Sequence, residues 1–421
     1  MARIAVLGVA ARAWRFGAYA ALCLPLLSCG GGSGGAGVSS TAPGGGGSTP
    51  TGANVAGIAV DAGPTSTNPE VNTLFTTVTV CVPGSTTSCQ TIDHIQVDTA
   101  SYGLRILAPV LTLSLPVQAT ASGGSLLECT QFVDGYSWGP IALADVQISG
   151  ESANSVPVQV IGDPNFTTVP TNCSSTGPAE DTVAAFGANG ILGIGVFAQD
   201  CGAGCETTVD NGSYYACTST LCQATTVLLA SQVQNPVTLF ATDNNGVVIQ
   251  LPSVAALGAA TVQGFLIFGI DTQTNNKSGN QTVLTVDPAD GDFTTIFNNQ
   301  PDLTRSFLDT GSNGLYFNDT GLTQCTQSNL TMFYCPSSPQ TLSAVLEGQN
   351  AVSATVNFTV GDAETLGAND PSLVAFPTLA GTYPATTDTF DWGLPFYYGR
   401  TVYTVIENTM TAVGTGPYVA F

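Results

Sequence analysis

One seven-residue motif occurs twice in this chain, 211 residues apart, and it constrains the fold more than any other feature. The first copy reads Asp-Thr-Ala-Ser-Tyr-Gly-Leu from Asp98, and the second reads Asp-Thr-Gly-Ser-Asn-Gly-Leu from Asp309. Apolar residues precede and follow each copy, which is typical of a strand that ends in a turn carrying one carboxylate. The repeat therefore predicts two similar lobes, each of which brings one aspartate to a shared site.

A second pair of segments follows the two motifs in the same order. The first contains Ile-Leu-Gly, ending at Gly193, and the second reads Trp-Gly-Leu-Pro-Phe around Gly393. Gly193 lies 95 residues after Asp98, and Gly393 lies 84 residues after Asp309. Glycine among large apolar residues indicates that neighbouring backbones approach closely in the interior. The two halves thus share an order of motifs and an approximate spacing.

Composition and patterning predict an all-β chain with many turns. Charged residues make up only 9% of the chain, and Gly, Ser, Thr, Asn and Val are plentiful. Polar and apolar residues alternate in short segments, and Asp134-Gly135 is a hairpin signal. One short helix is expected at residues 224–232. Strands are expected at residues 74–82, 92–97, 110–117, 146–148, 156–161, 237–240, 247–251, 265–268, 283–286, 352–360, 402–406 and 418–421.

Residues 1–29 have the features of an export signal. Three arginines precede an uncharged run that is too short to cross a membrane. Leu-Leu-Ser-Cys, ending at Cys29, matches a bacterial lipobox, in which the cysteine is lipidated; simple secretion with cleavage nearby is the alternative. Residues 30–56 are rich in Gly and Ser and predict a flexible tether. We therefore expect an exported protein of the bacterial cell envelope, held at the outer membrane by a lipid anchor on Cys29.

The charge balance excludes several classes of partner. The chain has seven Lys or Arg residues and 29 Asp or Glu residues. Three of the cations lie in the export signal, so the remainder keeps four cations and a formal charge of −25. Because phosphate binding requires clustered cations, we expect neither nucleic acid nor anionic membrane surfaces as partners. The single histidine, His94, excludes metal sites built on several histidines.

Ten cysteines remain once Cys23, in the signal, and Cys29 are set aside. An even number in an exported chain predicts disulfides. Four of the ten are spaced by 4, 12 and 5 residues, which does not match a zinc site, so no metal is expected. The expected pairs are Cys81–Cys89, Cys325–Cys335, Cys129–Cys173 and two nested bridges among Cys201, Cys205, Cys217 and Cys222.

With these motifs, residues 60–421 resemble the pepsin-like aspartic proteases. The two Asp-Thr-x-Ser turns carry the resemblance, together with the segments at Gly193 and Gly393. Phe-Gly-Ile-Asp at residues 268–271 resembles the segment where the chain of that family enters its second lobe. The resemblance implies a bilobal double β-barrel with pseudo-twofold related lobes and few short helices. The two lobes would span residues 57–262 and 263–421.

The resemblance also implies which side chains act. Two carboxylates at hydrogen-bond distance cannot both ionise cheaply, so Asp98 and Asp309 would share one proton. The pair would polarise a water molecule for attack on a peptide bond, without a metal or another cofactor. The supporting residues are Thr99 and Thr310, which would brace the turns, Ser101 and Ser312, which would bond the outer carboxylate oxygens, and Gly311, whose backbone N–H would approach a carboxylate.

The chain departs from that family at several positions. Ala100 stands in place of a glycine in the first turn, Asp391 in place of an apolar residue, and Arg105 where tryptophan is common. The family also closes a hairpin over its substrate with a tyrosine. The candidates for this flap are Phe132, Tyr136 and Trp138.

Three functions follow from these observations. The first is an exported, lipid-anchored aspartic endopeptidase that cleaves extended polypeptide segments. The second, motivated by Ala100 and the flap, is a catalytically inactive protein of the same fold that binds a protein ligand at the cell surface. The third is a β-rich adhesin without a cleft, which a wide separation of Asp98 and Asp309 would favour. The export signal, the low basic content and the repeated turns also resemble DUF3443, a family of bacterial lipoproteins.

Overall fold

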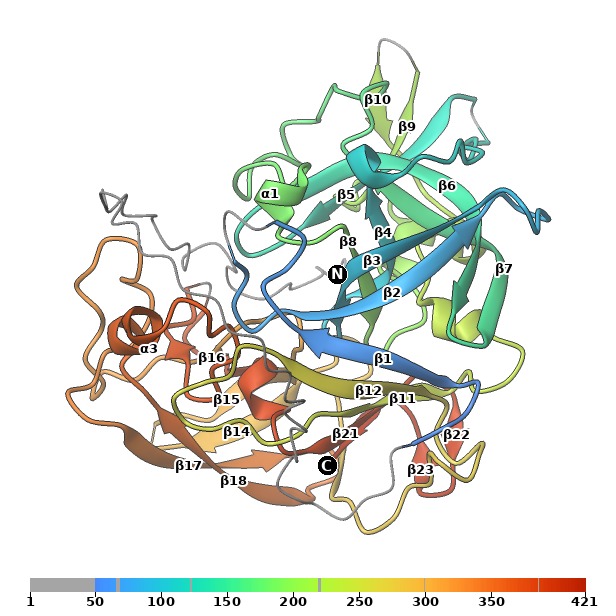
Figure 1. The fold of residues 1–421 in the computed structure, drawn as a ribbon. Coiled ribbons are helices and arrows are strands. Elements are labelled where there is room, and N and C mark those ends of the chain that lie inside the picture. The colour runs from blue at the N-terminus through green and yellow to red at the C-terminus, as the bar shows by residue number, and fades with distance from the viewer. Residues whose placement is uncertain (1–49, 66–68, 122, 219–220, 299, 385) are drawn as a thin grey trace, which may run out of the picture.

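The computed structural model shows an all-β double barrel, in which one lobe lies above the other in Figure 1. In that view β1, β11 and β12 run between the lobes. The structure describes residues 50–65, 69–121, 123–218, 221–298, 300–384 and 386–421.

The predicted export signal, Cys29 and most of the predicted tether lie outside the described residues and stay predictions. The tether ends earlier than expected, because the first strand, β1, spans Val55–Val60. In the described part of the chain, no helix is long and apolar enough to cross a membrane.

The first lobe contains β2 (Leu74–Cys81), β3 (Cys89–Asp98), β4 (Tyr102–Leu107), β5 (Ser125–Gln131), β6 (Tyr136–Ile148), β7 (Glu151–Ile161), β8 (Gly190–Ile194), β9 (Tyr214–Cys217) and β10 (Cys222–Ala224). Six of these strands pair in the order β6-β7-β4-β8-β3-β2, and β2 pairs again with β6 to close the barrel. Val78 and Val80 of β2 are buried while Thr77 is exposed, because successive side chains of a strand point to opposite faces.

The second lobe contains β14 (Phe293–Phe297), β15 (Leu303–Leu308), β16 (Leu315–Tyr316), β17 (Gln340–Glu347), β18 (Ser353–Val360), β19 (Ala380–Gly381) and β20 (Asp391–Trp392). They form a sheet in the order β18-β17-β14-β15-β20-β16-β19. Its core is aromatic: the rings of Phe390 and Trp392 stack with centroids 3.9 Å apart, and Phe317 stacks on Phe390 at 4.6 Å. Trp392 is fully buried.

Strands from distant parts of the chain join the lobes. They pair in the order β1-β12-β11-β21-β24-β13 and continue the first-lobe sheet through β2. Both ends of the described chain are therefore tied into one sheet. The remaining strands are β11 (Gly246–Gln250), β12 (Val262–Phe268), β13 (Val283–Thr285), β21 (Thr401–Val405), β24 (Tyr418–Ala420) and a small hairpin of β22 (Met410–Thr411) and β23 (Gly414–Thr415).

The two lobes have the same topology, and the sequence motifs occur in the same order in each lobe. In the first lobe β8 lies between β3 and β4, parallel to β3 and antiparallel to β4. In the second lobe β20 lies between β15 and β16, parallel to β15 and antiparallel to β16. The strand before each Asp-Thr turn, the strand after it and the glycine-containing strand thus have matching places, which agrees with the predicted pseudo-twofold relation.

Two predicted strands are wrong, and proline explains both. Residues 110–117 follow a 3₁₀ turn, η1 (Ala108–Val110), and residues 237–240 fall largely in another, η3 (Pro236–Leu239). Each turn has a proline in its first two positions. Proline lacks the N–H that a ladder of strands requires and fixes φ near the helical value.

The predicted helix at residues 224–232 is also wrong. The chain there is mostly extended, with a short 3₁₀ turn, η2 (Leu229–Ser231). The N–H of Val227 donates to the carbonyl of Cys205 at 2.8 Å, so a contact outside the segment replaces a helical hydrogen bond. The other helical elements are α1 (Val183–Phe186), α2 (Ala203–Thr207), α3 (Ala363–Asn369) and η4 (Leu394–Phe396).

Ten cysteines in the described residues form five disulfides. Cys81–Cys89, Cys129–Cys173 and Cys325–Cys335 are confirmed. The predicted nested bridges are wrong, because the pairs are Cys201–Cys205 and Cys217–Cys222. Cys217 and Cys222 lie opposite each other on the antiparallel strands β9 and β10, and Cys201 and Cys205 are four residues apart around the start of α2. Local geometry thus pairs each of these four cysteines with its nearest neighbour in sequence.

We expect alanine at Gly193 or Gly393 to destabilise the fold. A Cβ at Gly193 would lie 2.4 Å from the backbone N of Tyr102, and one at Gly393 would lie 2.0 Å from the carbonyl O of Gly314. Overpacking of this kind should lower the free energy of unfolding by about 1–3 kcal/mol or more, measured by denaturant titration. Gly57→Ala is the matched control, because nothing lies within 4 Å of a Cβ there. Equal effects at the three positions would contradict the prediction.

Candidate active site

Two strands, one from each lobe, deliver an aspartate to the boundary between the lobes. β3 ends at Asp98, and β15 ends at Leu308, one residue before Asp309. Asp98 lies opposite Gly193 in the parallel pairing of β3 with β8, and the glycine admits the close approach of the Ser101–Tyr102 backbone that follows Asp98. Both aspartates are fully buried. The repeated motif therefore forms two turns that meet inside the molecule.

The two carboxyl groups lie close enough for each to shift the pKa of the other. Ala100 donates its backbone N–H to Oδ1 of Asp98 at 2.8 Å, and Gly311 donates its N–H to Oδ1 of Asp309 at 2.6 Å. A Cβ at Gly311 would lie 2.9 Å from Oδ1 of both aspartates. The closeness of the carboxylates therefore requires glycine in the second turn.

Ala100 is compatible with the first turn. It is not among the described non-glycine residues with a positive φ, so its backbone does not need the left-handed region that favours glycine. Its N–H makes the same bond to Asp98 that Gly311 makes to Asp309. Its methyl group lines a cavity between the lobes.

Crossed hydrogen bonds hold the two turns together. The N–H of Thr310 donates to Oγ1 of Thr99 at 3.0 Å, and Oγ1 of Thr310 donates to the carbonyl of Val97 at 2.8 Å. Oγ1 of Thr99 donates to the carbonyl of Leu308 at 3.0 Å and lies 2.9 Å from the hydroxyl of Tyr397. Both threonines are thus placed to brace the pair of turns.

Burial raises the pKa of both aspartates, but not equally. For Asp98 burial is the largest effect, and the Ser101 hydroxyl, Asp309 and the positive charge of Arg105 are among the groups that oppose it. For Asp309 burial acts together with the negative charges of Asp98 and Asp391, and the pKa lies well above its usual value. The two carboxyls therefore titrate as a pair, in which one proton stays bound to higher pH than the other.

The two serines have different surroundings. The hydroxyl of Ser101 lies close enough to Asp98 to lower its pKa, without a hydrogen bond of ordinary geometry to any described residue. Ser312 donates to Oδ2 of Asp391 at 2.5 Å, and its hydroxyl is also near enough to Asp309 to lower the pKa of that carboxyl. The hydrogen bond of Ser312 thus goes to a carboxyl that was not a predicted partner.

A cavity of about 860 Å³ lies between the lobes beside the two turns. This volume is within the usual range for ligand pockets in proteins. Much of its wall is aromatic. The wall includes Thr99, Ala100 and Tyr102 of the first turn, Gln131, Phe132 and Val133 at the tip of the β5–β6 hairpin, and Phe293, Phe307 and Tyr383 of the second lobe.

Of the three flap candidates, Phe132 alone lines this cavity among the described residues. It is buried and packs on Phe186, with ring centroids 6.2 Å apart. Trp138 instead packs on Tyr215, with centroids 5.3 Å apart. Tyr136 pairs with the last residue of β5 at the base of the hairpin tip. The hairpin therefore presents Phe132 to the cavity and directs Trp138 to other contacts.

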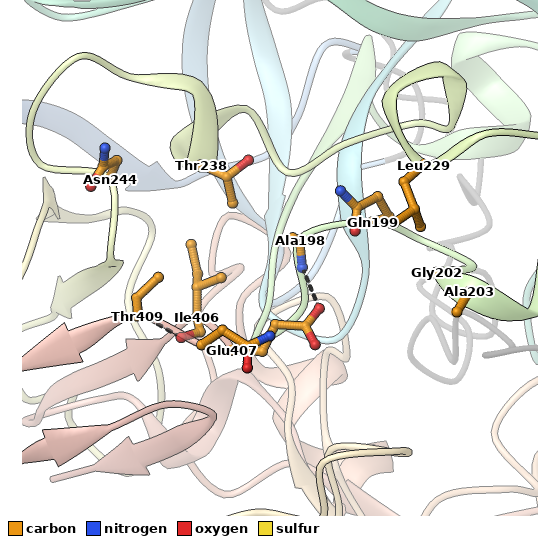
Figure 2. Close-up of a pocket in the computed structure, with 11 residues that line it drawn as sticks. Ala198, Gln199, Gly202, Ala203, Leu229, Thr238, Asn244, Ile406, Glu407 and Thr409 are labelled. Atoms are coloured by element: carbon orange, nitrogen blue, oxygen red, sulfur yellow. Dashed lines mark hydrogen bonds between the residues drawn. The ribbon is translucent and has the colours of Figure 1, made fainter. Parts of the chain in front are cut away.

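A second cavity, of about 530 Å³, lies away from the turns (Figure 2). Its wall includes Ala198, Leu229 and Glu407, and Oε1 of Glu407 accepts the N–H of Ala198 at 3.0 Å. Among the described residues of its wall, none is a predicted site residue. This cavity is therefore not part of the candidate site.

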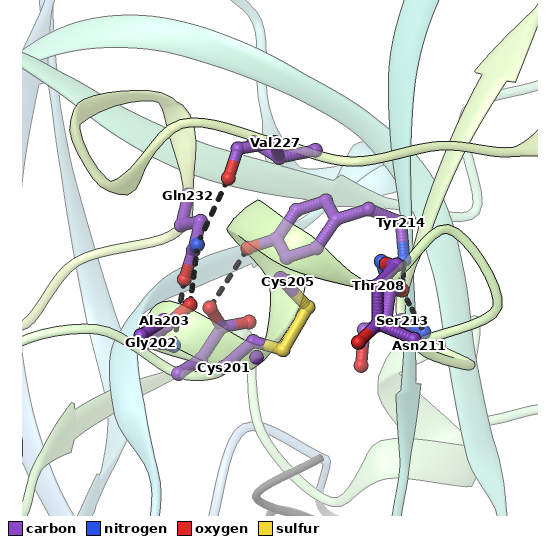
Figure 3. Close-up of a disulfide and its surroundings, with 12 residues drawn as sticks. Cys201, Gly202, Ala203, Cys205, Thr208, Asn211, Ser213, Tyr214, Val227 and Gln232 are labelled. Atoms are coloured by element: carbon purple, nitrogen blue, oxygen red, sulfur yellow. Dashed lines mark hydrogen bonds between the residues drawn. A yellow bond between two sulfur atoms is a disulfide. The ribbon is translucent and has the colours of Figure 1, made fainter. Parts of the chain in front are cut away.

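Arg105 is fully buried next to the first turn and is surrounded by acceptors. Its Nη2 donates to Oε1 of Glu128 at 2.6 Å and to Oδ2 of Asp200 at 3.2 Å. The hydroxyl of Tyr214 donates to the other oxygen of Asp200 at 2.8 Å, close to the Cys201–Cys205 disulfide (Figure 3). Buried charges require such partners. The network ties β4 to β5, the strand whose end reaches the cavity.

Several of these contacts have no counterpart among the predicted residues. Glu128 and Asp200 were not candidates, although a lone Glu within Leu-Leu-Glu-Cys and an Arg between Leu and Ile both point to buried charges that must pair. The contact of Tyr397 with Thr99 has no comparable signal, because 298 residues separate the two in the chain.

We expect Arg105→Met to be strongly destabilising, because it leaves Glu128 and Asp200 buried without their cation. Loss of one partner from a buried ion pair typically costs about 3–5 kcal/mol of the free energy of unfolding, measured by denaturant titration at neutral pH. Arg305→Met is the control, because Arg305 is 54% exposed and its ion pair with Asp292 is 3.7 Å long. An exposed pair should cost at most about 1 kcal/mol. Similar losses in the two variants would show that the buried network is not stabilising.

The family profile described as "Protein of unknown function (DUF3443)" matches residues 50–421, which include both turns, both lobes and the cavity. A comparison with curated proteins found no match. The profile covers well over half of the 421 residues. The chain therefore belongs to the DUF3443 family.

Proposed function

We propose that this protein is a pepsin-like aspartic endopeptidase that uses Asp98 and Asp309. The observation that supports this is the meeting of two buried carboxyl groups, carried by repeated turns and close enough for each to shift the pKa of the other. An aspartate that only caps a loop needs no second carboxyl beside it, and the contact of two like charges is costly. Sites that share a proton between two carboxyls use this arrangement for acid–base catalysis.

In the proposed reaction, a water molecule between the two carboxyl groups attacks the carbonyl carbon of a peptide bond. Asp98, the member that ionises first, takes a proton from the water, and Asp309 donates its proton to the carbonyl oxygen. Asp98 then gives its proton to the nitrogen, the C–N bond of the tetrahedral intermediate breaks, and a hydroxyl of the intermediate returns a proton to Asp309 as the carboxylic acid forms. One water is consumed, and one carboxylic acid and one amine are formed.

The cavity fits an extended polypeptide with apolar side chains. Its wall carries Phe132 on one side and Phe307 and Tyr383 on the other, so a bound segment would lie between the hairpin tip and the two turns. Burial raises the pKa of Asp292, another wall residue, to about 7. Below that pH the wall loses a negative charge, which favours work at acidic pH.

The proposed enzyme acts outside the cytoplasm. Five disulfides are typical of exported proteins. A lipid on Cys29 and attachment to the outer membrane belong to the same proposal. The partners would then be a polypeptide substrate and the lipid bilayer that holds the anchor.

We expect Asp98→Asn and Asp309→Asn each to abolish cleavage of an unfolded polypeptide at acidic pH. Removal of a catalytic acid or base should lower the cleavage rate by about 10²–10⁴-fold or more, measured by the appearance of new amino termini. Asp302→Asn is the control, because Asp302 is exposed, and it should keep the activity of the unchanged chain. Cleavage that survives in either dyad variant would overturn the proposal.

The second candidate is a catalytically inactive protein of this fold that binds a protein ligand. The full burial of Asp98 and Asp309 favours it, because neither lines the described cavity. An enzyme would have to move the hairpin tip to expose them. Binding of peptides in the cavity, with no cleavage across a broad pH range, would support this candidate. The closeness of the two carboxyls argues against the adhesin, which has no use for a shared site.

A further inference from the structure

A third buried carboxyl, Asp391, lies beside the proposed dyad. It starts β20 and is 0% exposed. In the second lobe it pairs with Tyr316, and the matching pair in the first lobe is Ile191 with Arg105. The first lobe thus has an apolar residue and a cation at these places, and the second has a carboxyl and a neutral phenol. The repeated topology therefore has a cation on one side and a carboxyl group on the other.

Within the described residues, the surroundings of Asp391 offer little to stabilise a negative charge. Its Oδ2 accepts the Ser312 hydroxyl at 2.5 Å, and its Oδ1 has no hydrogen-bond partner. Burial, Ser312 and the charge of Asp98 act on its ionisation, and no described cation is among these groups. A buried carboxylate without a cation or a set of donors is costly, so the neutral acid is favoured.

We propose that Asp391 is a positioning residue of the dyad: it remains protonated in the folded chain and, by holding the Ser312 hydroxyl, makes Asp309 the aspartate that keeps the shared proton. The catalytic part of this inference, the effect of Asp391 on the dyad, rests on the proposed function. The neutral acid carries its proton on Oδ1, which accepts no bond from the described residues, and uses Oδ2 to accept from Ser312.

The contacts show how Asp391 acts through Ser312. A hydroxyl that donates to Asp391 is not free to donate fully to Asp309, and Oδ2 of Asp309 has no hydrogen-bond partner among the described residues. An ionised Asp309 would therefore be poorly stabilised. Asp98 instead has the positive charge of Arg105 nearby. Both differences direct the negative charge of the dyad to Asp98 and the proton to Asp309.

The other ionisable groups facing Asp391 are all acids, so none offsets a negative charge there. Burial raises the pKa of the three tyrosines among them, so they stay neutral through the acidic and neutral range. The cluster therefore accommodates few negative charges at once. These facing groups are Asp98, Asp309, Tyr316, Tyr383 and Tyr397.

The first test counts protons and does not depend on activity. The folded-state pKa of Asp391 lies well above the usual value of 3.8, so the folded chain holds a proton that the unfolded chain releases. Its contribution to stability is full below the unfolded pKa and is lost as pH rises toward the folded pKa. Between about pH 5 and 7, Asp391→Asn should reduce the protons released on unfolding by about one, obtained from the slope of unfolding free energy against pH. Asp302→Asn, at an exposed site, should leave that number unchanged.

The second test uses the pH dependence of cleavage. Asp391→Leu cannot accept from Ser312, so the hydroxyl is free to donate to Asp309 and makes Asp309 easier to ionise. Asp391→Leu should then move the high-pH limb of the rate profile to lower pH, whereas Asp391→Asn, a neutral group whose oxygen can still accept from Ser312, should leave that limb in place. A structural role alone would lower the rate equally at every pH.

The outcomes separate this inference from the proposed function. If the dyad variants lose cleavage but Asp391→Asn leaves the proton count unchanged, or Asp391→Leu leaves the pH profile unchanged, the inference is wrong. If the chain cleaves nothing at any pH, the proposed function falls, and the proton count alone decides whether Asp391 is protonated. Should the asparagine variant not fold, Asp391→Leu also lacks the proton, resembles Ile191 in the matching place, and must show the same reduced proton release.

Discussion

The fold depends on the hydrogen bonds that cross between the two Asp-Thr turns. Thr99 and Thr310 are separated by 211 residues, yet each bonds the backbone of the strand that delivers the other aspartate. Two barrels can make these bonds only if the ends of β3 and β15 meet inside the molecule. The same geometry forces two carboxyl groups together away from solvent, which is a cost that the rest of the structure must offset.

That cost explains where the few cations are used. Only four Lys or Arg residues follow the predicted export signal, and Arg105 is buried beside the first turn among Glu128 and Asp200. Its charge favours ionisation of Asp98 and also links β4 to the strand that ends at the cavity. One buried cation thus serves both the hairpin and the dyad, which leaves the second turn without a comparable charge.

Local signals in the sequence were sufficient to predict an all-β chain of two similar lobes, and the resemblance carried by the repeated motifs implied the double barrel. The Asp-Thr turns, the glycines and two of the five disulfides could be read from short segments, and Cys129–Cys173 was the pair left over. The errors came from competing local or distant contacts. Pro236 turned an apolar segment into a 3₁₀ element, and the register of β9 and β10 set the pairing of Cys217. The bond from Ser312 to Asp391 spans 79 residues and required the folded lobes to be seen.

A repeated topology does not give two equivalent aspartates. The strand pairs that match across the lobes place Arg105 against Ile191 on one side and Tyr316 against Asp391 on the other. The backbone therefore supplies the symmetry that brings the carboxyls together, while four side chains next to the turns break it. Catalysis by a carboxyl pair requires one acid and one base at the same pH. On a symmetric backbone, the two aspartates can take these different roles only if the side chains around them differ in charge or polarity.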